Sequence, residues 1–377
     1  MKIKYILPLL LLPLAMCEEP FMPGKKEYDR ALVVEGMITN QPGPYTIRLS
    51  QTTPLGTDSI SPLTGCNVAL EEKAGPKHLL SETQPGVYQS AKKGIRGKVG
   101  HSYRLLIETP KGKTYQSDFI RMKPTVGIDS VYHRIEHHTS QNYPNGLPGY
   151  QFYLNTKKAV HDSTFFFWKL VETYEYTADF KIKGIFTNYQ IQPFYNYDTL
   201  YRCWNTQRVK EIFTARTSSL DQAQLNGHPL HFVGTDNKRL SIRYSLKVNQ
   251  YTVNEATYQY WDAIKEQISQ KEFLFSKQPY QIRGNIYSPD NPQELVRGYF
   301  TVASVKQDRI YVERPSLEFI YPRCVLDFEL GGLYYLPSSA WPVFLGKLGN
   351  SYGRANPECF DCRMEGGSLE KPDFWKD

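Results

Sequence analysis

Residues 240–249 read LSIRYSLKVN, and this stretch decides the fold class of the chain. Apolar and polar residues alternate without a break: Leu240, Ile242, Tyr244, Leu246 and Val248 against Ser241, Arg243, Ser245, Lys247 and Asn249. A period of two residues is that of a β-strand, because successive side chains point to opposite faces of a sheet. The stretch therefore predicts a strand with one apolar face and one solvated face, in a mainly β protein.

The same period recurs in shorter stretches near the N-terminus. Strands are expected at Leu32 to Ile38, Tyr45 to Leu49, Val68 to Leu70, Val87 to Gln89 and Tyr103 to Ile107, separated by glycine- and proline-containing turns such as Pro42-Gly43-Pro44. In the second of these, Tyr45, Ile47 and Leu49 share one face. Short strands at this spacing predict a small immunoglobulin-like β-sandwich over residues 29–124.

Residues 125–317 predict a second β domain with longer strands. Tyr150 to Leu154 and Phe165 to Tyr176 are the expected partners of the strand at 240–249, and Gly298 to Val305 and Arg309 to Val312 return to strand. One helix is expected near 255–269, where Asn254 can cap and Tyr258, Trp261, Ile264, Lys265 and Ile268 follow at helical spacing. Residues 318–377 form a tail rich in cysteine, glycine and aromatic residues, expected as irregular loops.

Composition excludes two classes of protein. Of the 377 residues, 40% are hydrophobic and 22% are charged, which is the range of globular rather than disordered chains. The formal net charge is +7, but no lysine and arginine cluster stands out, so we expect no nucleic-acid partner.

The N-terminus, MKIKYILPLLLLPLAMC, predicts export. A short basic segment with Lys2 and Lys4 precedes a brief apolar stretch, so residues 1–16 are expected as a signal peptide, one too short and too rich in proline to span a bilayer. Cys17 is the expected lipidation site, with residues 17–28 as a lipidated tether. Met16 departs from the small residue usual before such a cysteine, which leaves an ordinary secreted protein as the alternative.

The remaining cysteines predict disulfide bonds, the usual state in an exported protein. The candidates are Cys203, Cys324, Cys359 and Cys362. Cys66 is expected as the odd thiol, on the apolar face of a strand with Val68 and Leu70.

Three patterns suggest chemistry, but their context argues against it. Gly349-Asn350-Ser351-Tyr352-Gly353 matches a nucleophile elbow, yet no helix start follows Ser351 and no histidine lies beyond His231. His133, His137 and His138 could suggest a metal site, but Val131, His133, Ile135 and His137 alternate as in a strand. Cys359-Phe360-Asp361-Cys362 resembles half of a zinc ribbon or a redox pair without the other half. We therefore expect no enzyme activity, metal or cofactor.

Aromatic side chains in the tail are the candidate contacts for a partner or ligand. They are Tyr334, Tyr335, Trp341, Phe344, Phe374 and Trp375. Tyr and Trp are frequent at interface hot spots and stack on sugar rings, although packing beneath loops is the alternative.

Several ordered motifs resemble one family. They are Leu32-Val33-Val34-Glu35-Gly36-Met37-Ile38-Thr39-Asn40 with Gly43-Pro44-Tyr45, Gln281-Ile282-Arg283-Gly284-Asn285-Ile286, Gly298-Tyr299-Phe300, and the ending from Cys359-Phe360-Asp361-Cys362-Arg363 through Gly366-Gly367 to Lys371-Pro372-Asp373-Phe374-Trp375. The chain is similar over nearly its whole mature length to the Bacteroidota lipoproteins with domain of unknown function 4249. The resemblance implies an outer-membrane location and a TonB-dependent receptor as partner, and it carries over no catalytic residue.

Two short patterns resemble surface signals of the same phylum. Glu18 and Glu19 after Cys17 resemble an acidic export signal, which implies a lipoprotein facing the exterior. Four tripeptides resemble an O-glycosylation sequon, with Ser59, Ser130, Ser163 and Thr199 as the modified residues.

These observations lead to one expected function and its alternatives. We expect a non-enzymatic accessory or ligand-capture partner of a TonB-dependent transporter, active in nutrient uptake. The alternatives are a stand-alone glycan- or peptide-binding surface lipoprotein and an enzyme of unrecognised type.

Overall fold

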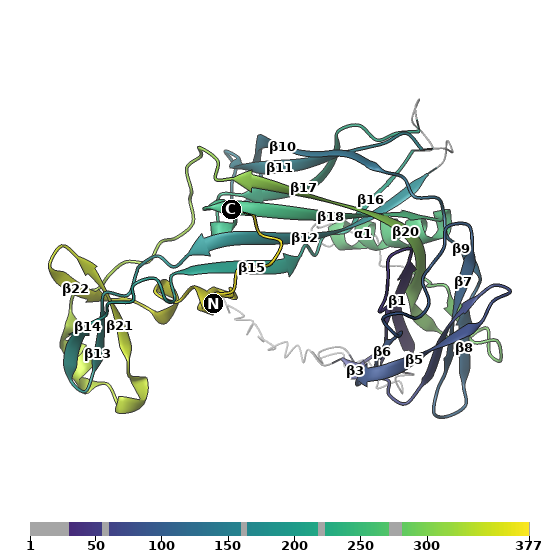
Figure 1. Ribbon diagram of the computed structural model, residues 1–377, viewed down its shortest axis with the longest axis horizontal. Coiled ribbons are helices and arrows are strands. Elements are labelled where there is room, and N and C mark those ends of the chain that lie inside the picture. Colours follow the sequence, from purple (N-terminus) through teal and green to yellow (C-terminus); the bar gives the residue numbers. More distant parts are fainter. Residues whose placement is uncertain (1–29, 55–59, 160–163, 218–222, 271–280, 377) are drawn as a thin grey trace, which may run out of the picture.

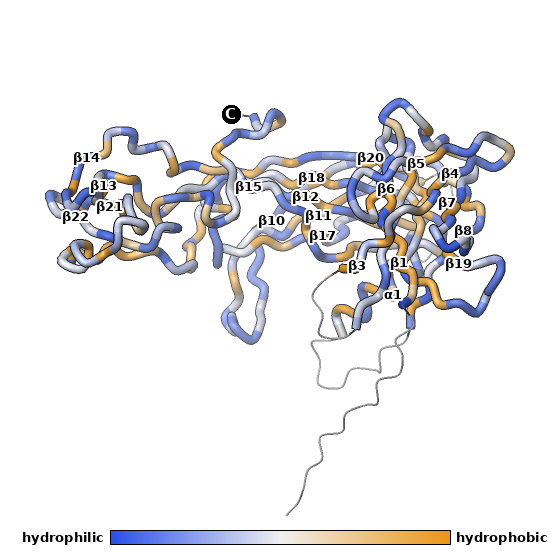
Figure 2. The backbone as a smooth tube through the Cα atoms, turned by 90° about the horizontal axis from the view of Figure 1, so that it is seen from below, coloured by the Kyte–Doolittle hydropathy of each residue, from blue (hydrophilic) through white to orange (hydrophobic). Residues whose placement is uncertain are grey.

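A computed structural model describes residues 30–54, 60–159, 164–217, 223–270 and 281–376. The expected signal peptide, Cys17, the tether, Ser59 and Ser163 lie outside these residues. The chain is mainly β, as the alternating patterns predicted, and its parts lie in a row (Figure 1). A strand-rich N-terminal unit occupies one end, two long sheets the middle, and a small sheet the other end, and a second view shows the same order (Figure 2).

The N-terminal unit curls around one apolar core. Its strands are β1 (Leu32–Thr39), β2 (Thr46–Gln51), β3 (Ser61–Pro62), β4 (Asn67–Glu72), β5 (Lys77–Gln84), β6 (Val87–Gln89), β7 (Ser102–Glu108), β8 (Thr114–Ser117) and β9 (Ile120–Arg121). Tyr45, Ile47 and Leu49 are buried together in that core, which confirms the face predicted for them. The antiparallel order β1-β2-β6-β5-β4-β7-β8 is that of strands folded over a shared interior.

This unit also takes in a segment that the sequence placed in the second domain. Strand β19 (Ile286–Tyr287) pairs with β8, and the first half of β20 (Val296–Glu313) pairs in parallel with β1. Ile286, Val296, Phe300 and Val302 lie in the N-terminal core. The two paired strands lie about 260 positions apart and are not joined by a turn. No local sequence pattern could therefore predict that β20 pairs in parallel with β1.

Two motifs of the family resemblance explain how this segment docks. A Cβ atom on Gly298, where φ is +87°, would lie 1.9 Å from the Val34 carbonyl oxygen, and one on Gly284 would lie 1.7 Å from the Gly298 carbonyl oxygen. The Asn285 amide bonds both backbone groups of Phe300: its nitrogen donates to the carbonyl and its oxygen accepts from the N–H, each at 2.8 Å. Only glycine allows backbones this close.

The central part is a sandwich of two sheets. One sheet has β10 (Ile128–His138), β11 (Leu147–Thr156) and β17 (His228–Gly234); the other has β12 (Phe165–Thr177), β15 (Arg202–Arg208), β16 (Phe213–Arg216), β18 (Arg243–Val253) and the second half of β20. Phe152 of β11 and Tyr244 of β18 meet between the sheets, with ring centroids 5.5 Å apart. Tyr150 to Leu154 therefore faces the strand at 240–249 across the core, and the prediction that they pair side by side is wrong; β12 does pair with β18.

Strand β18, predicted at residues 240–249, differs from its prediction in two details. It begins at Arg243, because Lys238–Leu240 forms a 3-10 turn, η1, capped by the Asn237 side chain. Tyr244, Leu246 and Val248 are fully buried as predicted, but the second face is not fully solvated. Ser245 is buried beneath Arg309, whose Nη1 donates to Ser245 Oγ at 3.0 Å.

The one α-helix in the described part of the chain, α1 (Glu255–Gln270), confirms the helix predicted near 255–269. Asn254 caps it, since its Oδ1 accepts a hydrogen bond from the Thr257 N–H at 3.0 Å. Tyr258 and Trp261 pack on Phe167, on the face of β12 opposite the sandwich core. Within the described residues, no helix is long and apolar enough to cross a membrane.

The tail is less irregular than expected. It forms the strands β21 (Val343–Leu348) and β22 (Ser351–Arg354), which join β13 (Gly184–Thr187) and β14 (Gln190–Pro193) in a separate four-stranded sheet. Four 3-10 turns complete it: η2 (Leu330–Tyr335), η3 (Ser338–Ala340), η4 (Pro357–Cys359) and η5 (Cys362–Glu365). Two disulfides, Cys203–Cys362 and Cys324–Cys359, staple the tail as predicted.

Candidate functional site

The small sheet and the segments around it form a distal lobe, residues 180–200 and 324–360, at the end of the molecule opposite the N-terminal unit (Figure 1). Its strands follow the order β14-β13-β21-β22, so a hairpin from the middle of the chain pairs with a hairpin from the tail. The Cys324–Cys359 bridge closes the tail segment at its base.

Glycines make this small sheet possible. Gly346 and Gly353 face each other across β21 and β22, and the Leu326 side chain lies over both. A Cβ atom on either glycine would come within 2.9 Å of Leu326. The absence of two side chains therefore lets Leu326, which packs with Ile182, Cys359 and Phe360, cover the thin sheet. Phe186, Leu333 and Leu345, each at most 1% exposed, form a separate core.

Aromatic rings surround that core and reach the surface. Tyr334 and Trp341 contact Phe186 edge-on, with ring centroids 5.2 Å and 6.3 Å apart, and Tyr189 contacts Trp341 at 4.8 Å. Tyr335, beside Tyr334 on η2, is 89% exposed. We call Tyr189, Tyr334, Tyr335 and Trp341 the aromatic patch.

Tyr189 is held in an unfavourable backbone conformation. It and Asn188 form the turn between β13 and β14 with φ values of +58° and +49°. Asparagine tolerates this left-handed region, but a bulky residue there is uncommon and costs about 1–2 kcal/mol. The ring is nonetheless 57% exposed, so it does not offset this cost by deep burial. Strain of this kind is typical of functional positions.

The lobe carries a disproportionate share of exposed apolar surface. Among the residues that the structure describes, eight of the eighteen large apolar residues that are clearly exposed lie in it: Tyr189, Tyr195, Tyr197, Val325, Phe328, Tyr334, Tyr335 and Leu348. Contiguous exposed apolar surface marks interaction sites more often than scattered single residues do.

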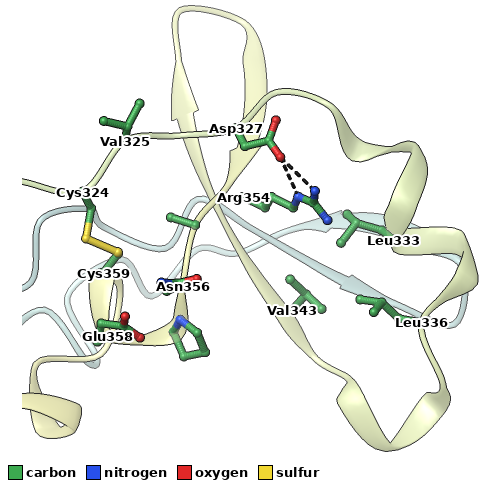
Figure 3. A pocket seen from close by; sticks show the side chains of 12 residues that line it. Cys324, Val325, Asp327, Leu333, Leu336, Val343, Arg354, Asn356, Glu358 and Cys359 are labelled. Carbon is green, nitrogen blue, oxygen red and sulfur yellow. Dashed lines mark hydrogen bonds and ion pairs between the residues drawn. A yellow bond between two sulfur atoms is a disulfide. The ribbon is translucent and has the colours of Figure 1, made fainter. Parts of the chain in front are cut away.

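A pocket of about 510 Å³ opens beside the patch (Figure 3). Leu333, Leu336 and Val343 form its apolar side, and the Cys324–Cys359 bridge lies across from them. Asn356 and Glu358 add polar groups near the bridge. This volume lies within the roughly 300–1,000 Å³ of small-ligand sites.

An ion pair fixes the rim of the pocket. Arg354 donates from Nε and Nη2 to Asp327 Oδ2, each at 2.9 Å, while the two backbones exchange hydrogen bonds at 2.8 Å (Figure 3). The Glu329 N–H and the Arg354 guanidinium hold the pKa of Asp327 below its usual range. The rim thus offers a charge pair beside an apolar wall, a combination suited to binding.

The six aromatic candidates of the tail do not come together. Tyr334, Tyr335 and Trp341 lie in the patch, but Phe344 packs inside the lobe against Phe360. Phe374 and Trp375 lie on the central sheet, where Arg309 covers the Phe374 ring at 3.8 Å and Trp375 is 5% exposed against Tyr311. Trp375 therefore offers little surface to a partner.

The contribution of β13 and β14 to the site was missed. Tyr189 comes from a hairpin about 150 residues before Trp341. The Asn188 turn was its local signal, but pairing with β21 depends on the whole fold.

The cysteines, histidines and sequons have definite places. Cys66 is free and 8% exposed, and burial raises the pKa of its thiol. His133, His137 and His138 lie on β10, the strand that their alternation predicted, and no metal-binding group of His, Cys, Asp or Glu occurs among the described residues. Ser351 begins β22 after a hairpin turn, with no helix after it. Of the sequons, Ser130 accepts a hydrogen bond from Asn155 at 2.9 Å, and Thr199 donates to the Asn196 carbonyl at 2.9 Å.

A family model described as domain of unknown function (DUF4249) matches residues 18–309. The chain belongs to this family. The match includes β13 and β14 of the distal lobe and ends before β21 and β22. A search of the curated proteins found no match.

Within this DUF4249 chain, the docking contacts of Gly284, Asn285 and Gly298 lie inside the matched residues. Gly298 brings β20 close to β1, and Gly284 and Asn285 hold the preceding segment on β20, so that part of the motif set is structural. The patch and pocket of the lobe are the candidate binding surfaces.

Proposed function

We propose that this chain is a lipid-anchored lipoprotein on the exterior of the outer membrane, and that it acts without catalysis as the partner of a TonB-dependent transporter. The observation that carries the proposal is the strained, exposed aromatic patch at the lobe farthest from the N-terminal unit. Cys17 precedes β1 in the sequence, so an anchor there would tether the chain through its N-terminal unit, and the lobe lies at the other end of the described residues (Figure 1).

Three further observations support it. The N-terminal segment has the pattern of a lipoprotein signal, and the motifs resemble lipoproteins associated with such receptors. The two disulfides suit an oxidising compartment. Two proteins held in one membrane meet at a high effective concentration, so a weak interface of a few aromatic side chains stays occupied.

Co-purification from native cells tests the proposal. Tagged wild-type protein, extracted in mild detergent, should bring down a TonB-dependent receptor that mass spectrometry identifies. Tyr335→Ala should reduce the recovered receptor strongly, because a Tyr at the centre of an interface contributes about 2 kcal/mol or more. Leu79→Ala, which changes a residue of the N-terminal unit that is 76% exposed against 89% for Tyr335, is the control.

Two results would contradict the proposal. One is recovery of no outer-membrane receptor with wild-type protein. The other is a Cys17→Ser variant that stays in the membrane fraction, since release is expected when the lipid chains are lost.

The second candidate function is a stand-alone surface protein that binds glycans or peptides. The open 510 Å³ pocket favours it, because a concave pocket with an apolar side and polar groups suits a small ligand. Saturable binding of a soluble ligand to the isolated ectodomain, with no receptor recovered, would place this candidate first.

A further inference from the structure

A second cavity, of about 380 Å³, lies where the central sandwich meets the tail. Its walls come from chain segments far apart in sequence: Tyr174, Gln207, Asn237, Lys238, Arg239, Tyr321, Pro322 and Glu365. It is separate from the distal lobe and from every contact in the proposed function.

A buried carboxylate orients two of these wall residues from behind. Glu172 is 2% exposed, and its oxygens accept hydrogen bonds from Gln207 Nε2 at 2.6 Å, Tyr244 Oη at 2.8 Å and Arg239 Nη1 at 3.5 Å. Arg239 Nε also donates to Asn237 Oδ1 at 3.0 Å. Gln207 and Arg239 are thus fixed before any ligand arrives, which lowers the entropy cost of binding.

Hydrogen-bonding capacity is left over at the cavity surface. An arginine has five N–H donors and a glutamine amide has two donors and one acceptor. The bonds to Glu172 and Asn237 use only part of this set. The cavity therefore offers oriented donors and acceptors on planar groups.

The charges of the cavity are already paired. Arg239 lies beside Glu172, and Lys238 Nζ lies 2.7 Å from Glu365 and 3.5 Å from Asp179. A charged ligand would have to break one of these pairs and leave a partly buried charge without a partner, which is costly. The walls therefore favour a neutral, strongly hydrogen-bonding ligand.

Two tyrosine rings complete the recognition chemistry. Tyr174 on β12 and Tyr321 in the tail add apolar ring surface to the polar walls. A neutral sugar has hydroxyl groups that donate and accept and a C–H face that packs on an aromatic ring. We propose that this cavity is a binding site for one neutral sugar unit.

The experiment uses the ectodomain with methyl glycosides of glucose, galactose and mannose, and with N-acetylglucosamine, followed by saturation-transfer NMR. At least one should bind saturably, with a Kd of about 1 mM. Gln207→Ala removes the oriented amide, and Pro322→Trp fills the cavity without removing a hydrogen-bonding group. Each should raise the Kd about tenfold or more. Gln192→Ala, an exposed glutamine on β14, is the matched control and should bind like wild type.

Three outcomes would overturn the inference. They are the absence of saturable binding by any of these sugars up to about 20 mM, tighter binding of glucuronate, glucosamine or glutamate than of the neutral sugars, and binding that both cavity variants leave unchanged. Because none of these readouts involves the receptor or the aromatic patch, failure here is distinguishable from failure of the proposed function.

Discussion

Cys203 on β15 is bonded to Cys362 on η5, which joins the central sandwich to a tail 159 residues later in the sequence. Both residues are fully buried, and the Tyr176 hydroxyl donates to the Cys362 carbonyl at 2.6 Å beside the bridge. The second bridge, Cys324–Cys359, closes only 35 residues within the distal lobe. One bridge therefore positions the tail on the body, and the other shapes the lobe.

We expect removal of the two bridges to have different effects, one on global stability and the other on the distal lobe alone. Loop-closure entropy gives upper estimates of about 5 kcal/mol for a 159-residue loop and about 4 kcal/mol for 35 residues. Replacing Cys203 and Cys362 by Ala should lower the free energy of global unfolding in urea. Replacing Cys324 and Cys359 should instead speed proteolysis between residues 325 and 342. Cys66→Ala, a buried cysteine without a bridge, is the control; equal lobe cleavage in both double variants would contradict the assignment.

Gly298→Ala should destabilise the protein by about 2–5 kcal/mol, because the new Cβ combines a left-handed backbone with a clash against Val34. Gly112 has a similar φ of +76° with nothing within 4 Å of an added Cβ. Gly112→Ala should therefore cost only about 1–2 kcal/mol. Urea unfolding of both variants measures the difference, and equal losses would show that the approach of β20 to β1 does not require the glycine.

Stability should depend on pH through two histidines whose pKa values shift in opposite directions, the half-buried His228 and the buried His231. Burial, with a smaller effect of Lys265, lowers the pKa of His228 from 6.5 to about 4. The unfolded chain therefore binds more protons between these values, and stability falls as pH drops from 6.5 to 4. A tenfold change in proton affinity corresponds to about 1.4 kcal/mol, so the free energy of unfolding falls by about 3 kcal/mol over this pH range.

For His231 the sign is reversed. Burial opposes protonation, but the hydrogen bond to Glu211 at 2.7 Å and the negative charges of Glu211 and of Glu172, 3.7 Å from Nε2, outweigh it and raise the pKa. This stabilisation is present below pH 6.5 and is lost as pH rises through the raised pKa. Urea unfolding at several pH values measures both effects. Compared with wild type, His228→Gln should lose less stability below pH 6.5, and His231→Gln should lose less stability above pH 6.5. Identical profiles in wild type and both variants would contradict this account.

The sequence predicted what local periodicity controls. Burial of Ile47 and Leu246 follows directly from alternation along a strand, and the Asn254 cap identified the helix start. Partnership between distant segments has no such signal. Trp375 is buried because Tyr311 of β20 lies beneath it, and the parallel pairing of β20 with β1 depends on close backbone contact at Gly298.

The candidate site was predictable only in part for the same reason. Tyr334, Tyr335 and Trp341 lie close together in sequence and were found from composition alone. Their contact with Tyr189 requires β13 to pair with β21, which an isolated sequence pattern cannot reveal.

Tyr189→Gly separates function from stability at the patch. Glycine adopts the φ of +58° without steric cost, so the backbone gains about 1–2 kcal/mol. The lost ring contact with Trp341 removes about 0.5–1.5 kcal/mol, and the freedom of glycine in the unfolded chain removes about 0.5–1 kcal/mol. The free energy of unfolding should therefore stay within about 1 kcal/mol of wild type, yet recovery of the receptor from native membranes should fall. Tyr195→Gly, in the same lobe but without a positive φ, should lose stability instead, because glycine in an ordinary conformation adds freedom to the unfolded chain. If Tyr189→Gly leaves both stability and receptor recovery intact, the strain at this turn has no part in partner binding, and the docking surface must lie elsewhere on the lobe.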